Sequence, residues 1–459
     1  MRKSYYFIGI GGIGMSAIAR YFMHEGCAVG GYDRTPSSLC DELEAEGAAI
    51  HYEDSVDMIG SDFRDPEQTT VIYTPAVPDD HSELCWFRTR GFRVMKRSQA
   101  LGVLSEGKYT MAVAGTHGKT TTTTLTAWLN RCITGGGNAF LGGISKNFSN
   151  NLVLGHGDRL AVEADEFDRS FLQLHPDVAV VTSADADHLD IYGTHEAVKE
   201  AFAQFISQIR PGGALIMKLG TDVAVRNDGI EVYAYSCDRP CDFHATNIRL
   251  AEGGHYRYDI VTPSGTITDC TTGVPGRVNI ENSIAATAMM WVAARRDATT
   301  LDEQRLREGL ASFSGVRRRF DFYVNTPRQV YMDDYAHHPR ELMATITSVK
   351  AMFPGRRLTA LFQPHLYPRT RDLCDGFAEA LSCADEVVLL PIYPAREEPI
   401  EGVTSEIIAR KVTVPCRTVE LERLADEVAA MDTDIVVSFG AGNIDACCDA
   451  LAETARKKS

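Results

Sequence analysis

The sequence predicts an α/β fold of three domains, with a Rossmann-like domain at each end and a mostly parallel sheet in the middle. Short apolar runs alternate with amphipathic helical patterns along the chain, as expected for parallel strands covered by helices. Glycine-rich loops follow two of these runs, at residues 9–14 and 115–119. The chain has 459 residues, and this length favours about two to four domains over one core.

The first domain is expected to cover residues 1–106. Its predicted elements, in order, are a strand at 5–10, a helix at 16–24, strands at 27–32 and 70–73, and a turn-rich segment at 74–80. The second domain is expected to cover 107–323. Its predicted elements are a strand at 109–114, a loop at 115–119, a helix from 120, strands at 160–163, 178–182 and 214–217, and a helix at 280–294. Residues 244–270 alternate with period two between glycine-rich turns, which indicates antiparallel hairpins.

The third domain, at 324–459, repeats the alternation of strand and helix. Its predicted elements are strands at 329–333, 358–362, 386–390 and 435–439, and a helix at 373–381. Gly440-Ala441-Gly442 follows the last strand. This pattern predicts a Rossmann-like C-terminal domain.

The charge balance restricts the classes of partner. Acidic residues number 62 and basic residues 46, which gives a formal net charge of −16. Nucleic-acid binding needs a basic face, so we expect no nucleic-acid partner. Anionic substrates must then be bound by local groups such as helix N-termini, lysine, arginine or a metal ion.

The cysteines and the apolar runs predict a cytoplasmic protein, and we expect a monomer or a homodimer. The 12 cysteines show no framework spacing, as expected for reduced thiols. Cys237, Cys241 and His244 resemble half a zinc site without a second pair of ligands. No uninterrupted run of about 18 apolar residues occurs, so we expect no membrane span. Glycines from Gly9 to Gly14 interrupt the apolar start, which argues against a signal peptide.

The first glycine loop predicts a diphosphate site. Residues 9–14 read Gly-Ile-Gly-Gly-Ile-Gly, a G-x-G-x-x-G pattern between a predicted strand and a predicted helix. Glycines let the backbone approach a diphosphate, whose charge lies at the helix N-terminus. Asp33 lies 19 residues after Gly14, where a ribose-binding acid is expected. Alone, this loop leaves open an NAD-dependent oxidoreductase, or a glycine turn without a ligand.

The second glycine loop predicts a P-loop ATPase-like central domain. Gly115-Thr116-His117-Gly118-Lys119-Thr120-Thr121 follows a predicted strand. Its N–H groups can hold phosphates, Lys119 can reach the outer ones, and the Thr120 hydroxyl can bind Mg²⁺. Val113 stands where the usual pattern has its first glycine, so the loop is a variant. A dehydrogenase does not need this loop, so the two loops together indicate ATP and a second, diphosphate-bearing nucleotide.

Acidic residues at the ends of two later strands predict the metal ligands. Glu163 ends the predicted strand at 160–163 and is the expected Mg²⁺ ligand. His188 lies in the acidic segment 185–190 and is the candidate ligand of a second Mg²⁺. A structural role for His188 remains open, because Mg²⁺ prefers oxygen ligands.

These segments resemble the Mur ligase family, and the resemblance covers nearly the whole chain. The matching segments are the P-loop at 114–122, the acidic segments at 163–168 and 187–190, an adenine-binding N-x-x-N segment at 279–283, a phosphate-contacting arginine segment at 318–320, and a C-terminal ATP loop at 333–339. The resemblance implies the following ATP-binding residues: Gly115, Thr116, His117, Gly118, Lys119, Thr120, Thr121, Asn279, Asn282, Arg319, Asp334 and His337.

The resemblance also implies the other binding residues and a reaction. The UDP-sugar residues are Gly11, Gly12, Ile13, Gly14, Asp33, Thr74 and Ala76. The amino-acid residues are Tyr335, His365 and Arg369. The catalytic residues are Lys119, Glu163, His188, Arg319 and Arg369, and the metal ligands are Thr120, Glu163 and His188.

Residues 7–16, 362–365 and 369–372 resemble the members that join L-alanine to UDP-N-acetylmuramate. The implied reaction uses ATP and two Mg²⁺ ions to couple L-alanine to the lactyl carboxylate through an acyl phosphate. Leu366 and Pro368 differ from the usual family residues at those positions. The alternatives are a related Mur-type ligase acting on a murein peptide, a folate or a polymer, the oxidoreductase, and a nucleotide-binding regulatory protein without chemistry.

Overall fold

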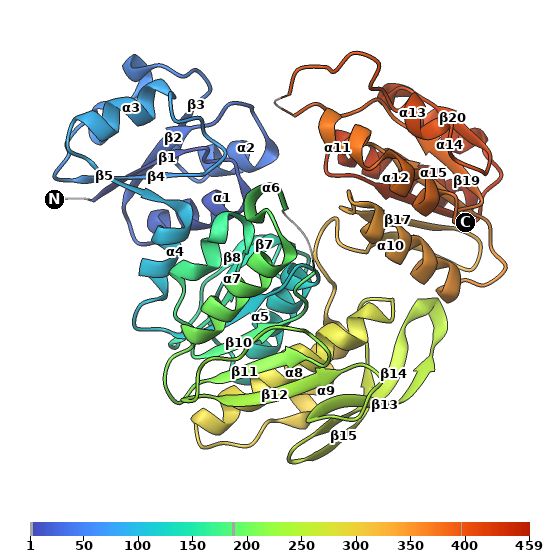
Figure 1. Cartoon of the computed structure of the whole chain (residues 1–459), viewed down its shortest axis with the longest axis horizontal. Helices are drawn as coiled ribbons and strands as arrows, with labels where there is room; N and C mark the ends of the chain where they lie inside the picture. The colour runs from blue at the N-terminus through green and yellow to red at the C-terminus, as the bar shows by residue number, and fades with distance from the viewer. Residues whose placement is uncertain (1–2, 186–188, 396) are drawn as a thin grey trace. The chain divides into compact units, whose positions relative to one another are not determined.

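The computed structural model describes residues 3–185, 189–395 and 397–459. Its strands form three parallel-rich sheets (Figure 1). The contacts group the chain into two compact units. The first comprises Met1–Thr246, Asp259–Cys270 and Glu281–Ser314, and the second comprises Asn247–Tyr258, Thr271–Ile280 and Gly315–Ser459. The three domain ranges 1–106, 107–323 and 324–459 stay a prediction.

The first sheet is parallel and has the order β3-β2-β1-β4-β5. Its strands are β1 Ser4–Ile8, β2 Ala28–Tyr32, β3 Ala49–His51, β4 Thr69–Tyr73 and β5 Arg93–Lys96. Its helices are α1 Ile13–His24, α2 Ser38–Ala45, α3 Ser82–Thr89 and α4 Arg97–Ser105. The central strand β1 is largely buried, because β2 and β4 pair with its two edges and α1 packs against it. The predicted strand at 5–10 is too long, since Gly9 has a φ of 86° and turns the chain toward α1.

The second sheet has the order β15-β14-β13-β12-β11-β10-β6-β9-β7-β8. The strands are β6 Tyr109–Ala114, β7 Asn138–Ser145, β8 Asn150–Val153, β9 Arg159–Glu163, β10 Val178–Val181, β11 Ala214–Lys218, β12 Glu231–Ser236, β13 Phe243–Leu250, β14 Tyr256–Thr262 and β15 Gly265–Thr271. The helices are α5 Lys119–Thr134, α6 Leu189–Tyr192, α7 His195–Ser207, α8 Val278–Arg296 and α9 Glu303–Ser312. Strand β6, which precedes the second glycine loop, is fully buried between β10 and β9.

The third sheet has the order β16-β17-β21-β18-β19-β20, parallel except for β16 against β17. The strands are β16 Asp321–Asn325, β17 Val330–Asp334, β18 Leu358–Phe362, β19 Glu386–Leu389, β20 Cys416–Thr418 and β21 Ile435–Phe439. The helices are α10 Pro339–Met352, α11 Tyr367–Asp372, α12 Cys374–Leu381, α13 Glu406–Ala409, α14 Leu424–Ala430 and α15 Cys448–Lys458. Separate apolar clusters cover its two faces, as in an open parallel sheet.

The predicted fold class is confirmed: the chain is a three-domain α/β protein with parallel-rich sheets. In the described residues, the helices are too short or too polar to cross a lipid bilayer.

Candidate nucleotide and substrate sites

The first glycine loop is braced by the strand beside it. The N–H groups of Gly9 and Ile10 donate to the Tyr32 carbonyl at 2.7 and 3.0 Å. The Asp33 carboxylate accepts a hydrogen bond from the Gly11 N–H at 2.8 Å. The residue expected to bind the ribose therefore holds the loop in place. Gly12 is the N-cap of α1. Since it has no side chain that could occupy the first-turn N–H groups, they remain suited to an anion.

The remaining residues predicted for the UDP-sugar lie around this loop. Ile13 and Gly14 open α1. The Thr74 methyl group lies so close to Gly9 that a Cβ there would be 2.5 Å from it. Ala76 is exposed in the turn after β4. The carboxyl edge of the sheet therefore carries these residues next to one another, as the doubly wound arrangement requires.

A basic side chain that the sequence analysis missed faces the first loop. A Cβ added at Gly14 would lie 2.8 Å from Nη1 of Arg97. Arg97 also donates through Nη2 to Asp165 at 3.4 Å, and the neighbouring Lys96 pairs with Asp168 at 2.8 Å. The adjacent basic residues Lys96 and Arg97 could have indicated this contact from the sequence. They stand at the end of β5, which belongs to the same edge of the sheet as the first glycine loop.

The second glycine loop is supported by the two residues that follow strand β10. Thr182 donates to the His117 carbonyl at 2.5 Å, and the His117 N–H donates to Ser183 at 3.1 Å. The hydroxyls of Thr116 and Ser183 are 2.7 Å apart. Gly115 and Gly118 have φ values of 134° and 79°, which disfavour any residue with a Cβ.

The departure from the usual P-loop has a local structural reason. Val113, at the position of the missing glycine, is an inner residue of β6 and fully buried. The turn begins only after Ala114. A glycine at 113 is therefore not required by the backbone.

Lys119 forms a buried ion pair that the sequence analysis did not assign. Its Nζ lies 2.8 and 2.9 Å from the carboxylate oxygens of Glu166, which is 1% exposed. Burial lowers the pKa of Lys119, but the carboxylates of Glu166, Asp165 and Glu163 raise it more, and the net shift is upward. The Lys119 ammonium group therefore stays charged beside the second glycine loop.

The predicted metal ligands of the described region lie at adjacent element ends. Thr120 is buried in the first turn of α5, and Glu163 ends β9 next to β6. The Glu163 carboxylate lies against Gly142 of β7, where a Cβ would be 2.5 Å from its Cδ. The predicted ligand His188 lies outside the described residues.

The N-x-x-N segment lies on α8. Asn282 accepts from Thr122 of α5 at 3.2 Å, and a Cβ at Gly118 would be 3.1 Å from its Oδ1. Asn279 donates to the Pro275 carbonyl at 2.7 Å. Thr121, also predicted for ATP, is a partly exposed residue of α5. Asn282 is therefore fixed against the P-loop.

Both arginines of the segment 318–320 lie near the Tyr335 ring, but they differ in their other contacts. Arg318 turns onto the carboxyl edge of the third sheet, where it donates to Asp333 at 3.2 Å and to the Gly440 carbonyl at 2.5 Å. Arg319, the predicted ATP ligand, lies with its guanidinium 5.0 Å from the centroid of the Tyr335 ring. This places Arg319 beside a residue predicted for the amino acid.

The C-terminal ATP loop carries a buried acid. Asp334 is 8% exposed and accepts from Thr345 at 2.6 Å. Burial raises the pKa of Asp334 to about 6. His337 Nδ1 contacts the Tyr335 carbonyl at 3.0 Å, while His338 caps α10 through the Arg340 N–H.

The residues predicted for the amino acid gather at one edge of the third sheet. The rings of His337 and His365 are 6.4 Å apart, and His365 stacks on Tyr393 at 5.8 Å. Burial, together with the charges of Arg369 and His337, lowers the pKa of His365 to about 4. A neutral imidazole is therefore available at neutral pH. No local pattern in the sequence pointed to Tyr393, which lies stacked on His365.

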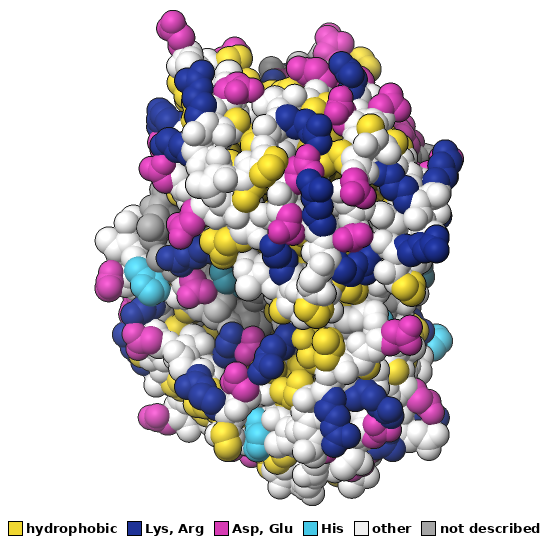
Figure 2. Space-filling view, turned by 90° about the vertical axis from the view of Figure 1, so that its right-hand side faces the viewer, with side chains coloured by type: hydrophobic (Ala, Val, Ile, Leu, Met, Phe, Trp, Pro, Cys, Tyr) yellow, Lys and Arg dark blue, Asp and Glu magenta, His cyan; other side chains and the backbone are white. Residues whose placement is uncertain are grey.

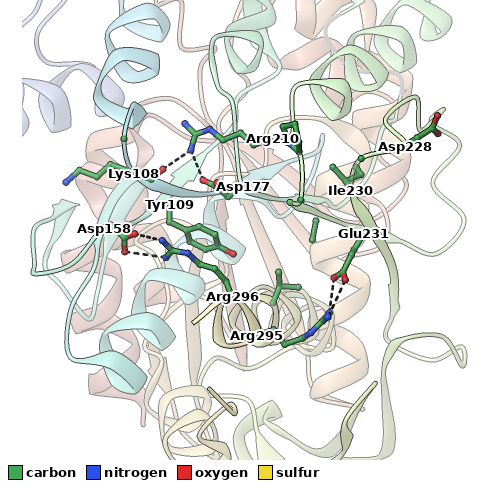
Figure 3. A pocket seen from close by; sticks show the side chains of 17 residues that line it. Lys108, Tyr109, Asp158, Asp177, Arg210, Asp228, Ile230, Glu231, Arg295 and Arg296 are labelled. Atoms are coloured by element: carbon green, nitrogen blue, oxygen red, sulfur yellow. Dashed lines mark hydrogen bonds and ion pairs between the residues drawn. The ribbon is translucent and has the colours of Figure 1, made fainter. Parts of the chain in front are cut away.

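A pocket of about 790 Å³ lies elsewhere, at the amino edge of the second sheet (Figure 3). Six of its charged residues form three ion pairs with one another. The pairs are Arg210 with Asp177 at 2.8 Å, Arg296 with Asp158 at 2.6 Å, and Arg295 with Glu231 at 2.8 Å. It carries neither glycine loop, so we do not assign the nucleotides to it.

The face shown in Figure 2 and the described cysteines point to no additional site. On the face shown in Figure 2, Lys and Arg side chains are interspersed with Asp and Glu. Cys237 is buried and Cys241 half-buried, and His244 Nδ1 contacts the Cys241 carbonyl at 2.8 Å. Among the described residues, which leave out His188, no cluster of three or more His, Cys, Asp or Glu side chains could hold a metal ion.

Comparisons with known proteins agree over the whole chain. The Mur ligase family catalytic domain matches residues 4–109, the Mur ligase middle domain matches 113–290, and the Mur ligase glutamate ligase domain matches 318–442. UDP-N-acetylmuramate–L-alanine ligase of Parabacteroides distasonis is 51% identical over 98% of this chain and 96% of its own. The protein of the same name from Phocaeicola vulgatus is 49% identical over 96% of each chain.

Solved structures show the same architecture. The UDP-N-acetylmuramate-alanine ligase of Thermotoga maritima superposes with a TM-score of 0.82 at 26% identity, over 99% of this chain and 100% of that one. A murein peptide ligase of Psychrobacter arcticus shares the fold, with a TM-score of 0.70 at 21% identity over 98% of each chain. The chain belongs to the Mur ligase family.

Proposed function

We propose that this chain joins L-alanine to the lactyl carboxylate of UDP-N-acetylmuramate with ATP, giving UDP-N-acetylmuramoyl-L-alanine, ADP and phosphate. The observation that carries the proposal is the 51% identity, over 98% of the chain, to a relative that bears the name of this ligase. The two glycine loops, each between a buried strand and a helix, agree with a nucleotide substrate in addition to ATP.

The first sheet would bind the UDP-sugar. The N–H groups at residues 11–14 would hold the diphosphate at the N-terminus of α1, and Arg97 would add a cation beside Gly14. Asp33 would act by fixing Gly11, and Thr74 and Ala76 would border the ribose or the base. Arg97 is supported by its position at Gly14 and by its link to Asp165.

The second loop would bind the phosphates of ATP, with Asn279 and Asn282 near the adenine. Thr120 and Glu163 offer a hydroxyl and a carboxylate, which suit a hard cation such as Mg²⁺. When bound, Mg²⁺ would offset negative charge on the phosphates. His188 is proposed as the ligand of a second ion. Lys119 would hold the outer phosphates as a point charge after leaving Glu166.

The chemistry then depends mostly on positioning and on neutralising charge. The lactyl carboxylate attacks the γ-phosphate of ATP, and the acyl phosphate and ADP form. The amine of L-alanine attacks the acyl carbon, and phosphate leaves from the tetrahedral intermediate. Lys119 and Arg319 would stabilise charge on the phosphoryl group during transfer.

The third sheet would bind the amino acid. Arg369 would pair with the carboxylate of L-alanine, because its planar fork suits bidentate recognition. Tyr335, His365 and the stacked Tyr393 would surround the rest of the amino acid. Asp334 and His337 would contact ATP from the same edge.

The test is phosphate release from ATP and Mg²⁺, with and without UDP-N-acetylmuramate, across L-alanine, L-serine, glycine and D-glutamate. Release that needs both the UDP-sugar and L-alanine supports the proposal. Release with a murein peptide in place of L-alanine would instead favour the related peptide ligase. Release that is indifferent to the UDP-sugar would contradict the assignment of the first glycine loop.

A further inference from the structure

The hairpin of β7 and β8 lies beside both predicted nucleotide sites. Strand β7 pairs in parallel with β9, the strand that ends at Glu163, and β8 pairs with β7 at the edge of the sheet. Helix α1, which begins at the first glycine loop, packs on both strands of the hairpin. The Tyr21 and Phe140 rings meet there at 5.8 Å.

Asn151 of β8 is fully buried and directed at the first turn of α1. Its amide nitrogen donates to the Ile13 carbonyl at 2.6 Å and to the Ser16 hydroxyl at 2.8 Å. Its amide oxygen accepts from Arg20 at 2.8 Å. The side chain therefore uses both ends of its amide to fix the helix turn that follows Gly12.

Arg20 secures the same contact from the helix. It is 5% exposed and pairs with Glu42 of α2 at 2.5 Å and with Glu46, the C-cap of that helix, at 2.9 Å. It also donates to Asn150 at 3.1 Å. Because the guanidinium is held on several sides, α1 has little freedom to rotate or slide over the hairpin.

The other strand of the hairpin reaches the ATP side. Gly142 of β7 lies against Glu163, and an added Cβ would be 2.5 Å from the Cδ of that carboxylate. One hairpin thus contacts the helix start proposed for the diphosphate and the carboxylate proposed for Mg²⁺. A rigid spacer of this kind fixes the distance between the two sites.

We propose that Asn151 is a positioning residue for the UDP-sugar, acting through the first turn of α1 without touching the substrate. This inference rests on the proposed function, because it takes the N-terminus of α1 as the diphosphate site. Acyl-phosphate formation needs the attacking carboxylate about 3–3.5 Å from its target, and small displacements slow such reactions strongly. Asn151 would keep the UDP-sugar in register with the P-loop.

The experiment compares three variants of the full chain. N151A removes the whole contact, S16A removes only one acceptor of the Asn151 amide, and N147A is the matched control. Asn147 lies in the same unit and donates to the Ser312 carbonyl at 2.9 Å and accepts from the Ser314 N–H at 2.8 Å, away from α1. The dissociation constants of UDP-N-acetylmuramate and of ATP are measured separately by calorimetry, together with kcat and the melting temperature.

We expect N151A to raise the Kd of the UDP-sugar by about tenfold, the effect of losing one or two hydrogen bonds. S16A should raise it less, and both should leave the Kd of ATP within about twofold. N147A should lower the melting temperature without changing either Kd. S16A keeps the test decisive if N151A does not fold.

The inference is overturned if N151A or, where that variant does not fold, S16A binds the UDP-sugar as the wild type does. It is also overturned if the Kd of ATP rises as much as that of the UDP-sugar, because the effect is then a general loss of structure. Neither outcome touches the proposed function, which is decided by the substrate requirement of the wild-type enzyme.

Discussion

Arg97 donates to Asp165 at 3.4 Å while its guanidinium lies against Gly14, so one side chain contacts both predicted nucleotide sites. Gly14 belongs to the first glycine loop, and Asp165 to the acidic segment that borders Lys119. The two loops are about a hundred residues apart in sequence. This relationship gives the first prediction.

Arg97→Ala should raise the KM for UDP-N-acetylmuramate by about tenfold or more, because a hydrogen bond to a charged group contributes about 1.5–3 kcal/mol. The KM for ATP should change much less. Steady-state kinetics with each substrate varied in turn measures both. Lys96→Ala is the control, since it breaks only the pair with Asp168. Equal changes of both KM values in Arg97→Ala would refute the role of Arg97 at the diphosphate.

Glu166→Gln should lower the pKa of Lys119, because Glu166 is the first of the carboxylates that raise it. The activity of the variant should therefore decline at a lower alkaline pH than that of the wild type. Removing one partner of a buried pair should also lower the free energy of unfolding by about 3 kcal/mol. A pH profile of kcat/KM measures the first effect, with Asp168→Asn as the control on the same segment. An unchanged alkaline limb would show that the pair does not govern the charge of Lys119.

Glu163→Gln should increase the Mg²⁺ concentration for half-maximal phosphate release by more than about tenfold, because the variant loses a negative oxygen ligand. A Mg²⁺ titration in metal-free buffer measures this. The control is Glu196→Gln on α7, an exposed carboxylate of the same unit. If both variants respond to Mg²⁺ as the wild type does, Glu163 is not a ligand.

Glu83 should make the stability of the protein depend on pH. It is fully buried and accepts from Tyr6 at 2.8 Å, and burial raises its pKa from 4.5 to about 7. Folding therefore favours the protonated acid: the stabilisation is complete below about pH 4.5 and is lost as the pH rises to about 7. The shift corresponds to about 3 kcal/mol.

The side chain at position 83 does not titrate in Glu83→Gln, so the stability of this variant should lack this dependence on pH. Urea unfolding at pH 5 and pH 8 measures the difference between the two proteins. We expect the wild type to lose about 3 kcal/mol relative to Glu83→Gln between these values. The variant Glu67→Gln, at an exposed residue in the turn before β4, should follow the wild type. A parallel response of Glu83→Gln and the wild type would contradict the raised pKa.

Strands buried on both faces could be predicted closely from the sequence. The predicted ranges 109–114, 358–362 and 435–439 coincide with β6, β18 and β21. Each is an apolar run followed by a polar or glycine turn, and that pattern is local. The edge strands β3 and β20, of three residues each, were not predicted, because three residues are too few to show an alternation of apolar and polar side chains.

Some features of the candidate sites needed the tertiary structure. Arg97 and Asn151 carry no motif of their own, and Glu166 lies in the acidic segment 163–168 but had no role assigned to it. All three are defined by partners far away in sequence. Arg318 and Arg319 are equivalent in the sequence, but only Arg318 turns onto Asp333 and Gly440. Which of two neighbouring arginines reaches a given strand end depends on the direction in which the backbone turns at that point.

The sequence by itself thus determined the α/β class, the buried strands and both glycine loops, because spacing along the chain is enough to specify a strand, a turn and a helix start. Only the tertiary structure decided that Lys119 pairs with Glu166, that Asp33 holds Gly11, and that Asn151 fixes α1. In each case, several residues with the same chemical groups could have been the partner. They depend on distance in space, which the order of residues along the chain does not contain.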